Sequence, residues 1–212
     1  MNRKWKQIIM AFIGTVIASI CVGALKHVAL GTDPFNSGIV GLANLFHTTY
    51  GVAYLGVIGS LLVLVLFVDR HYIGVTTIFN LLVVGYLVDW ATMVFQQWVP
   101  TPTLLIRCMI FLVAMIVLCF GCSFYITADL GVSSYDALAL ILADKKVLPF
   151  KYGRIGGDLI CVAIGFSFHA TIGIGTLITA CFMGPIIDFF NVHVSTLFLN
   201  GGQQIQIKEE VL

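Results

Sequence analysis

Only 10% of the 212 residues are charged and 59% are hydrophobic, whereas an average soluble domain has about 25% charged residues, so the chain is not an ordinary soluble protein. Its mean hydropathy of +1.03 predicts an all-α protein that crosses a membrane several times. The formal net charge of +1, without a basic patch, argues against a nucleic-acid-binding protein.

Six apolar segments approach or exceed the length needed to cross about 30 Å of hydrocarbon. The first follows a basic N-terminus, but it is longer than the core of a signal peptide and has no clear cleavage site. We therefore expect it to remain as an uncleaved span. The predicted spans are residues 8–30, 50–68, 74–95, 104–128, 154–169 and 174–191.

Two further segments, 34–47 and 134–143, have helical patterns but are too short to span, at about 21 and 15 Å of helix. Asp33 is expected to cap the first of them. In the second, Ser133 is expected to act as N-cap, with Asp136 three residues later as in a capping box. We expect both helices to lie at the membrane interface or to re-enter the membrane.

An internal duplication relates the two halves of the chain. The predicted repeats cover about residues 8–95 and 104–191 and are joined by a linker at 96–103. Residues 201–212 are expected to form a polar cytoplasmic tail. Matched small or polar positions, 99 residues apart, are Gly74 and Gly173, Thr77 and Thr176, Asn80 and Thr179, Gly85 and Gly184, and Asp89 and Asp188.

Basic residues indicate the orientation. With six spans and both termini in the cytoplasm, only Lys26 and Arg107 lie outside, which agrees with the positive-inside rule. Each half then has three spans, so the halves are inverted, an arrangement common in secondary transporters. Eight crossings with parallel repeats fit the same distribution and stay open. The inner residues are Arg3, Lys4, Lys6, Arg70, Lys145, Lys146, Lys151, Arg154 and Lys208.

Polar residues within the apolar helices are the candidate functional residues. Those on the duplicated helices can contact a polar solute, or they can bond backbone carbonyls between closely packed helices. Intramembrane carboxylates are costly and suggest coupling or gating, with capping and interfacial anchoring as the alternatives. Candidates for substrate binding are Asn36, Thr77, Asn80, Thr176 and Thr179, and candidates for coupling or gating are Asp33, Asp89, Asp136 and Asp188.

The remaining charged residues are interpreted as membrane anchors. Arg154 and Asp158 are four residues apart, which predicts an intrahelical pair at the inner interface. Lys145, Lys146 and Lys151 are expected to contact anionic lipid headgroups. The sequence has no nucleophile–base pairing, metal-ligand motif or phosphate loop, so we expect no enzyme activity, catalytic residue, metal or cofactor.

A set of motifs resembles a known protein group across almost the whole chain. The motifs are Leu30-Gly31-Thr32-Asp33-Pro34-Phe35, Gly74 to Thr77, Leu130-Gly131 with Tyr135 to Leu138, and Gly173 to Thr176 with Gly184-Pro185. Together they resemble the bacterial YczE/YyaS/YitT group of integral membrane proteins, nearest its YczE-like branch, although Phe35 stands where that group usually has tryptophan. The resemblance implies a multi-pass protein of the bacterial cytoplasmic membrane and carries over no catalytic residue.

Two functions fit these patterns. The first is a small-solute permease or transporter-like protein with its ligand site between the duplicated helices, because packing alone does not require the same polar positions in both halves. The alternative is a non-transporting membrane interaction or regulatory subunit, although short loops offer a soluble partner little surface. The expected partners are the lipid bilayer and an unidentified small solute, and a homo-oligomer is compatible with the sequence.

Overall fold

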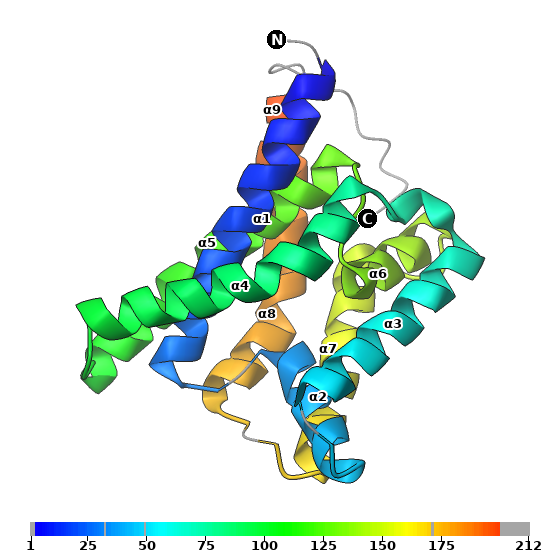
Figure 1. Ribbon diagram of the computed structural model, residues 1–212. Helices are drawn as coiled ribbons and strands as arrows, with labels where there is room; N and C mark the ends of the chain where they lie inside the picture. The colour runs from blue at the N-terminus through cyan, green and yellow to red at the C-terminus, as the bar shows by residue number, and fades with distance from the viewer. Residues whose placement is uncertain (1–2, 32, 49, 171, 200–212) are drawn as a thin grey trace.

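The computed structural model describes residues 3–31, 33–48, 50–170 and 172–199, which form helices joined by short turns (Figure 1). No β-strand occurs in these ranges, which confirms the predicted all-α class. In chain order the elements are α1 (Arg3–Val28), α2 (Pro34–Leu45), α3 (Tyr50–Val68), the 3₁₀ turn η1 (Arg70–Tyr72), α4 (Val75–Trp98), α5 (Leu104–Ala128), α6 (Ser134–Asp144), α7 (Phe150–Ser167), α8 (Ile174–Phe190), the π-helical turn η2 (Asn191–Ser195) and α9 (Thr196–Leu199).

Three helical stretches in the described part of the chain are long and apolar enough to cross a membrane, namely Arg3–Val28, Leu104–Ala128 and Ile174–Leu199. Val52–Val68 is a shorter apolar helix. The last stretch is longer than predicted, because α8 continues through Pro185 and is followed directly by η2 and α9. The expected interruption at that proline is therefore wrong.

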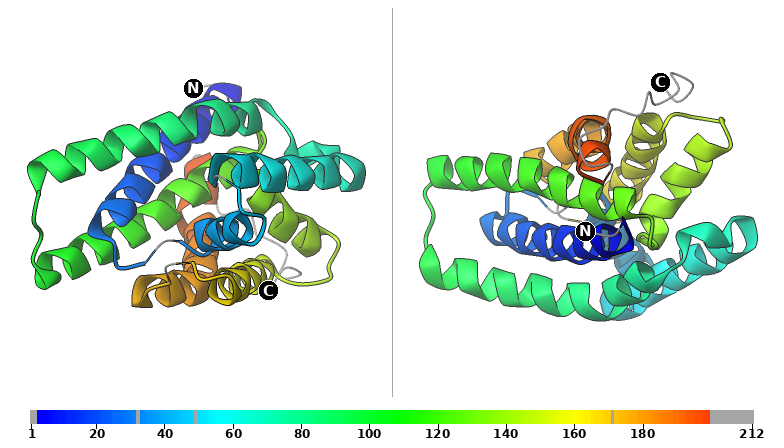
Figure 2. Two further views of the ribbon diagram at one scale, coloured as in Figure 1. Left: turned by 60° about the horizontal axis from the view of Figure 1, so that its bottom comes forward. Right: turned by 90° about the horizontal axis from the view of Figure 1, so that it is seen from above.

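Helix α1 lies between α4 and α5 (Figure 2, right). The start of α5 meets the end of α1, since Arg107 contacts Val28, so the two helices run antiparallel. They cross where glycine faces glycine: a Cβ added at Gly14 would lie 2.6 Å from the carbonyl oxygen of Gly121. Small residues at such crossings allow two backbones to approach closely without a hydrophobic driving force between them.

The short helix α2 packs along α7 through its small residues. A Cβ at Gly41 would lie 2.8 Å from the carbonyl oxygen of Ile164, and a Cβ at Gly165 would lie 2.8 Å from that of Ser37. The small and polar face of α2 is therefore buried against α7. Helix α6 packs against α7 and α3.

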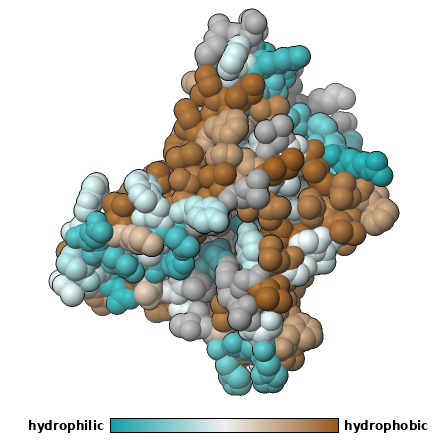
Figure 3. Space-filling view, viewed as in Figure 1, coloured by the Kyte–Doolittle hydropathy of each residue, from teal (hydrophilic) through white to brown (hydrophobic). Residues whose placement is uncertain are grey.

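Large apolar side chains cover much of the outer surface (Figure 3). Phe67, Tyr86 and Ile174 are 84%, 81% and 78% exposed, respectively. Hydrophilic residues instead gather at the tips, including the end of the α4–α5 arm on the left of the view. An apolar girdle with polar ends is the surface that a bilayer requires, so the surface supports the assignment as a membrane protein.

Candidate functional site

The two Leu-Gly turns contact the starts of the two duplicated helices in a crossed arrangement. The carbonyl oxygen of Leu30 accepts a hydrogen bond from the N–H of Gly175 at 3.0 Å, and that of Leu130 accepts one from Thr76 at 3.1 Å. Each turn therefore binds the helix of the opposite half of the chain. The two contacts recur at the offset of 99 to 100 residues found in the sequence.

The backbone of these turns also recurs. Gly31 and Gly131 have φ angles of 133° and 99°, a region that a side chain at Cβ rarely permits. Two residues earlier, Ala29 and Asp129 have φ angles of 49° and 55°. Each turn thus ends its preceding helix in a left-handed conformation.

Thr77 and Thr176 tie this arrangement together instead of lining an open space. The Thr77 hydroxyl donates to the carbonyl oxygen of Val132 at 2.8 Å and accepts from the N–H of Gly74 at 3.2 Å. The Thr176 hydroxyl accepts from the N–H of Gly173 at 3.4 Å. Both threonines are buried. Their described contacts are structural.

The other predicted substrate-binding residues lie apart from one another. Thr179 is buried, and its hydroxyl bonds back to the carbonyl oxygen of Gly175 at 3.0 Å. Asn36 donates its side-chain N–H to the Asp33 carboxylate at 3.1 Å. Asn80 is partly exposed and makes no hydrogen bond with another residue in the described ranges. A solute site on these residues stays a prediction.

The carboxylates of the duplicated helices also occupy different surroundings. The Asp89 side chain is 63% exposed and lies 3.0 Å from Lys26 Nζ. Asp188 is half-buried and lies within electrostatic range of Lys151. Asp33 caps α2 as predicted, because its carboxylate accepts from the N–H of Asn36 at 2.8 Å. Roles for these carboxylates in coupling or gating stay predictions.

A buried charged network lies where α6 meets α7. Arg154 is 8% exposed and forms ion pairs with Asp136, which is 4% exposed, and Asp158, which is fully buried. Two tyrosines complete it: Tyr125 donates its hydroxyl to Asp136, and Tyr135 donates its hydroxyl to Asp158 at 2.6 Å. The Arg154 guanidinium also lies 4.6 Å from the centre of the Tyr135 ring, a cation–π contact.

Residues from the first half of the chain approach the same network, which we call the interior network (Tyr125, Tyr135, Asp136, Arg154 and Asp158). Phe35 of α2 lies 4.6 Å from Tyr135 between ring centres, and the two residues are equivalent under the 100-residue offset. Asp33 is within electrostatic range of Asp158 and Arg154. The network therefore lies where the two short helices converge.

Asp33 lies in the connection between α1 and α2 and has an altered titration. Burial raises its pKa from 3.8 to about 6, while the hydrogen bond from Asn36 opposes the shift. The negative charge of Asp158 raises the pKa further, and Arg154 lowers it. A carboxyl group with this pKa can change its protonation near neutral pH.

Two sequence interpretations need correction at this network. Arg154 and Asp158 were expected at the inner interface, but α6 and α8 cover them and both are buried. Asp136 was expected to complete a capping box with Ser133, but its carboxylate is bound to Arg154 and Ser133 makes no side-chain cap. The spacing did predict the pair between Arg154 and Asp158. A guanidinium one turn inside an apolar helix was the signal for its burial.

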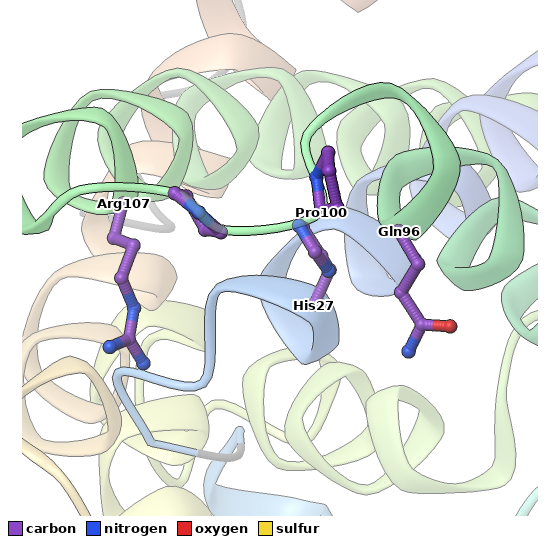
Figure 4. Close-up of a pocket in the computed structure, with 5 residues that line it drawn as sticks. His27, Gln96, Pro100 and Arg107 are labelled. Atoms are coloured by element: carbon purple, nitrogen blue, oxygen red, sulfur yellow. The ribbon is translucent and has the colours of Figure 1, made fainter.

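A second polar site lies at the tip of the α4–α5 arm. Figure 4 shows His27, Gln96 and Arg107 around a pocket of about 450 Å³. They come from the end of α1, the end of α4 and the start of α5. Within the described ranges, no group of three His, Cys, Asp or Glu side chains has a geometry that could hold a metal ion.

Comparison with known proteins places the chain in a family. Residues 5–192 match a family described as "Family of unknown function (DUF6198)". The chain is 25% identical over 191 residues to the uncharacterized protein YyaS of Bacillus subtilis (strain 168), covering 89% of this chain and 94% of YyaS. It is 23% identical over 180 residues to the uncharacterized membrane protein YczE of the same organism, covering 84% of this chain and 82% of YczE.

An uncharacterized protein of Haemophilus influenzae is 23% identical over 191 residues, covering 89% of this chain and 85% of that protein. No solved structure matches the chain significantly. The family match covers most of the chain, and the similarity to YczE agrees with the apolar helices and apolar surface. The chain is therefore a membrane protein that belongs to the DUF6198 family and is related to YyaS and YczE.

Proposed function

We propose that the protein is a small-solute permease of the bacterial cytoplasmic membrane in which the interior network forms the centre of the transport site. The observation that carries the proposal is the burial of Asp136, Arg154 and Asp158 inside an apolar helical protein. Charged side chains in such an interior are expensive and usually mark an ion or substrate path. A buried ion pair is weak evidence of stabilisation, because apolar side chains of similar volume often serve as well.

The position of the interior network supports the same function. In transporters built from inverted repeats, binding sites lie at the repeat interface near the membrane centre. Here Asp136, Arg154 and Asp158 come from the second half, while Phe35 and Asp33 approach from the first. Movement of one half relative to the other would change these contacts, which is what alternating access requires.

We further propose six crossings, made by α1, α3, α4, α5, α7 and the continuous α8–α9, with α2 and α6 as re-entrant helices. The α1–α2, α4–α5 and α7–α8 connections lie toward the bottom and left of Figure 1, whereas the start of α1 and the ends of α3 and α5 lie toward the top and right. The crossed contacts of the Leu-Gly turns and their recurring φ angles support inverted halves.

The charge of the site favours a positively charged ligand. Asp33, Asp136 and Asp158 contribute up to three negative charges, and Arg154 contributes one positive charge. A proton, a small organic cation or the amino group of a zwitterion would reduce this excess. An anionic solute would add to it. Asp89 is not part of this site, since its side chain is exposed and paired with Lys26.

The test is charge movement in proteoliposomes on a solid-supported membrane. Choline, putrescine and glycine serve as cationic and zwitterionic probes, with acetate and glucose as anionic and neutral controls. We expect a protein-dependent current with at least one of the first three. Asp158→Asn should abolish it, and Asp89→Asn, the same change at an exposed position, should retain it.

The result that would refute the proposal is equal current in wild type and Asp158→Asn, or no current with any cationic or zwitterionic probe while a protein partner co-purifies with the wild type. The second outcome would favour the interaction-subunit alternative. Both variants must reach the membrane and elute as wild type does in size-exclusion chromatography.

A further inference from the structure

The polar pocket at the tip of the α4–α5 arm continues into an apolar groove. The groove has a volume of about 360 Å³ and lies over α1, between Phe95 of α4 and the first turns of α5. His27 follows Ala24 by three residues, and Arg107 precedes Ile110 by three, so one helix turn separates the pocket lining from the groove lining. The groove is lined by Ile20, Cys21, Ala24, Phe95, Met109, Ile110, Val113, Ala114 and Val117.

Arg107 gives the polar end a positive charge. Its Nε and Nη2 donate to the carbonyl oxygens of Val28 and Ala29, at 2.5 and 3.0 Å, which leaves further N–H groups of the guanidinium unassigned. No carboxylate within the described ranges forms an ion pair with Arg107. The nearby Lys26 is paired with Asp89 and adds no net charge.

The start of α5 adds to this preference for an anion. Thr103 is the N-cap of α5 but makes no side-chain hydrogen bond to it, so the first backbone N–H groups remain available. A helix N-terminus also favours a nearby negative charge. Arg107 at this position raises the positive potential, which a bound phosphate group would neutralise.

From this geometry we propose that the groove binds one bilayer phospholipid with a net negative headgroup. Its phosphate contacts Arg107 at the polar pocket, and one acyl chain lies in the apolar groove along α1 and α5. The occupant is a lipid because the polar pocket and the groove are continuous and the groove opens between apolar, exposed positions. Met109 and Val113 on its wall are 60% and 62% exposed, on a surface that faces the bilayer.

The site differs from the interior network and does not depend on transport. It also differs from the lysines expected to contact headgroups, Lys145, Lys146 and Lys151, which follow α6 and begin α7. A failure of lipid binding would leave the permease proposal intact, and a failure of transport would leave the lipid site intact.

The experiment is native mass spectrometry of the full-length protein, purified in detergent and titrated with phosphatidylglycerol or phosphatidylcholine of the same acyl chains. We expect one phosphatidylglycerol per protein to be retained preferentially. Arg107→Gln should weaken this first binding step about tenfold, the loss expected for a charge-assisted hydrogen bond. Arg70→Gln, at an exposed arginine that donates to Leu66, is the matched control and should bind as wild type.

A second pair of variants tests the apolar groove without changing charge. Met109→Trp should fill the groove and weaken binding of both lipids, whereas Leu105→Trp, at an exposed position outside the groove, should not. Inorganic phosphate alone should give no thermal stabilisation, while phosphatidylglycerol should raise the melting temperature.

The proposal is overturned if both lipids bind wild type equally, if Arg107→Gln and Arg70→Gln behave alike, or if Met109→Trp binds as wild type. Stabilisation by inorganic phosphate equal to that by phosphatidylglycerol would also overturn it, since the site would then be a phosphate site without a chain groove. Because Arg107 also holds the end of α1, the tryptophan variants decide the outcome if Arg107→Gln fails to fold.

Discussion

Removing the guanidinium from the interior network should destabilise the protein strongly. Arg154→Met keeps a long apolar side chain against Tyr135 and Met183 but leaves Asp136 and Asp158 buried without a positive partner. Loss of one partner from a buried pair costs about 3–5 kcal/mol. For a chain of this size that corresponds to a fall of roughly 6–20 °C in melting temperature.

The comparison that identifies the cause is a variant without any charge in the interior network. Arg154→Met combined with Asp136→Asn and Asp158→Asn leaves no buried carboxylate to neutralise, so it should recover a large part of the loss. Arg70→Met, at an exposed arginine, should stay within about 0.5 kcal/mol of wild type. Melting followed by intrinsic fluorescence in detergent measures all three. A triple variant no more stable than the single variant would refute the explanation by uncompensated charge.

Three further results are expected. Gly173→Ala should lower the melting temperature by the equivalent of about 2 kcal/mol or more, because its Cβ would collide with the Leu30 carbonyl, whereas Gly56→Ala, with open space around it, should gain up to about 1 kcal/mol from helix propensity. Asp89→Asn should change stability by less than about 1 kcal/mol, since its exposed ion pair contributes little; a larger loss would show a hidden role. Burial raises the pKa of Asp33 from 3.8 to about 6, so its contribution to stability is full below pH 3.8 and is lost as the pH rises to about 6. Asp33→Asn should flatten the melting profile across that window, and an unchanged profile would contradict the pKa assignment.

The sequence predicted the elements of the fold well because apolar length and glycine-containing turns are local signals. The predicted segments 34–47 and 134–143 correspond to α2 (Pro34–Leu45) and α6 (Ser134–Asp144). Asp33 caps α2 as expected. The duplication also identified the pairs of turns and helix starts that make equivalent contacts, although it did not show that each turn binds the opposite half.

The interior network could not be predicted from the same signals, because it depends on which helices cover each charged residue. Arg154 and Asp158 lie near the start of α7, where a position at the membrane interface was equally consistent with the sequence. Their burial follows from the packing of α6 and α8 on that turn. Asp136 likewise had a local explanation as a capping residue, and the guanidinium of Arg154 offered it a stronger partner.

The crossed Leu-Gly turns have a consequence for the synthesis of the protein. The carbonyl oxygen of Leu30 is exposed early, at the end of the first helix, yet its partner Gly175 belongs to the last long helix. The first turn must therefore wait for nearly the whole chain before this bond can form. A ribosome-bound first half should remain incompletely packed in the membrane, and the two halves should mature as one cooperative unit when α8 arrives.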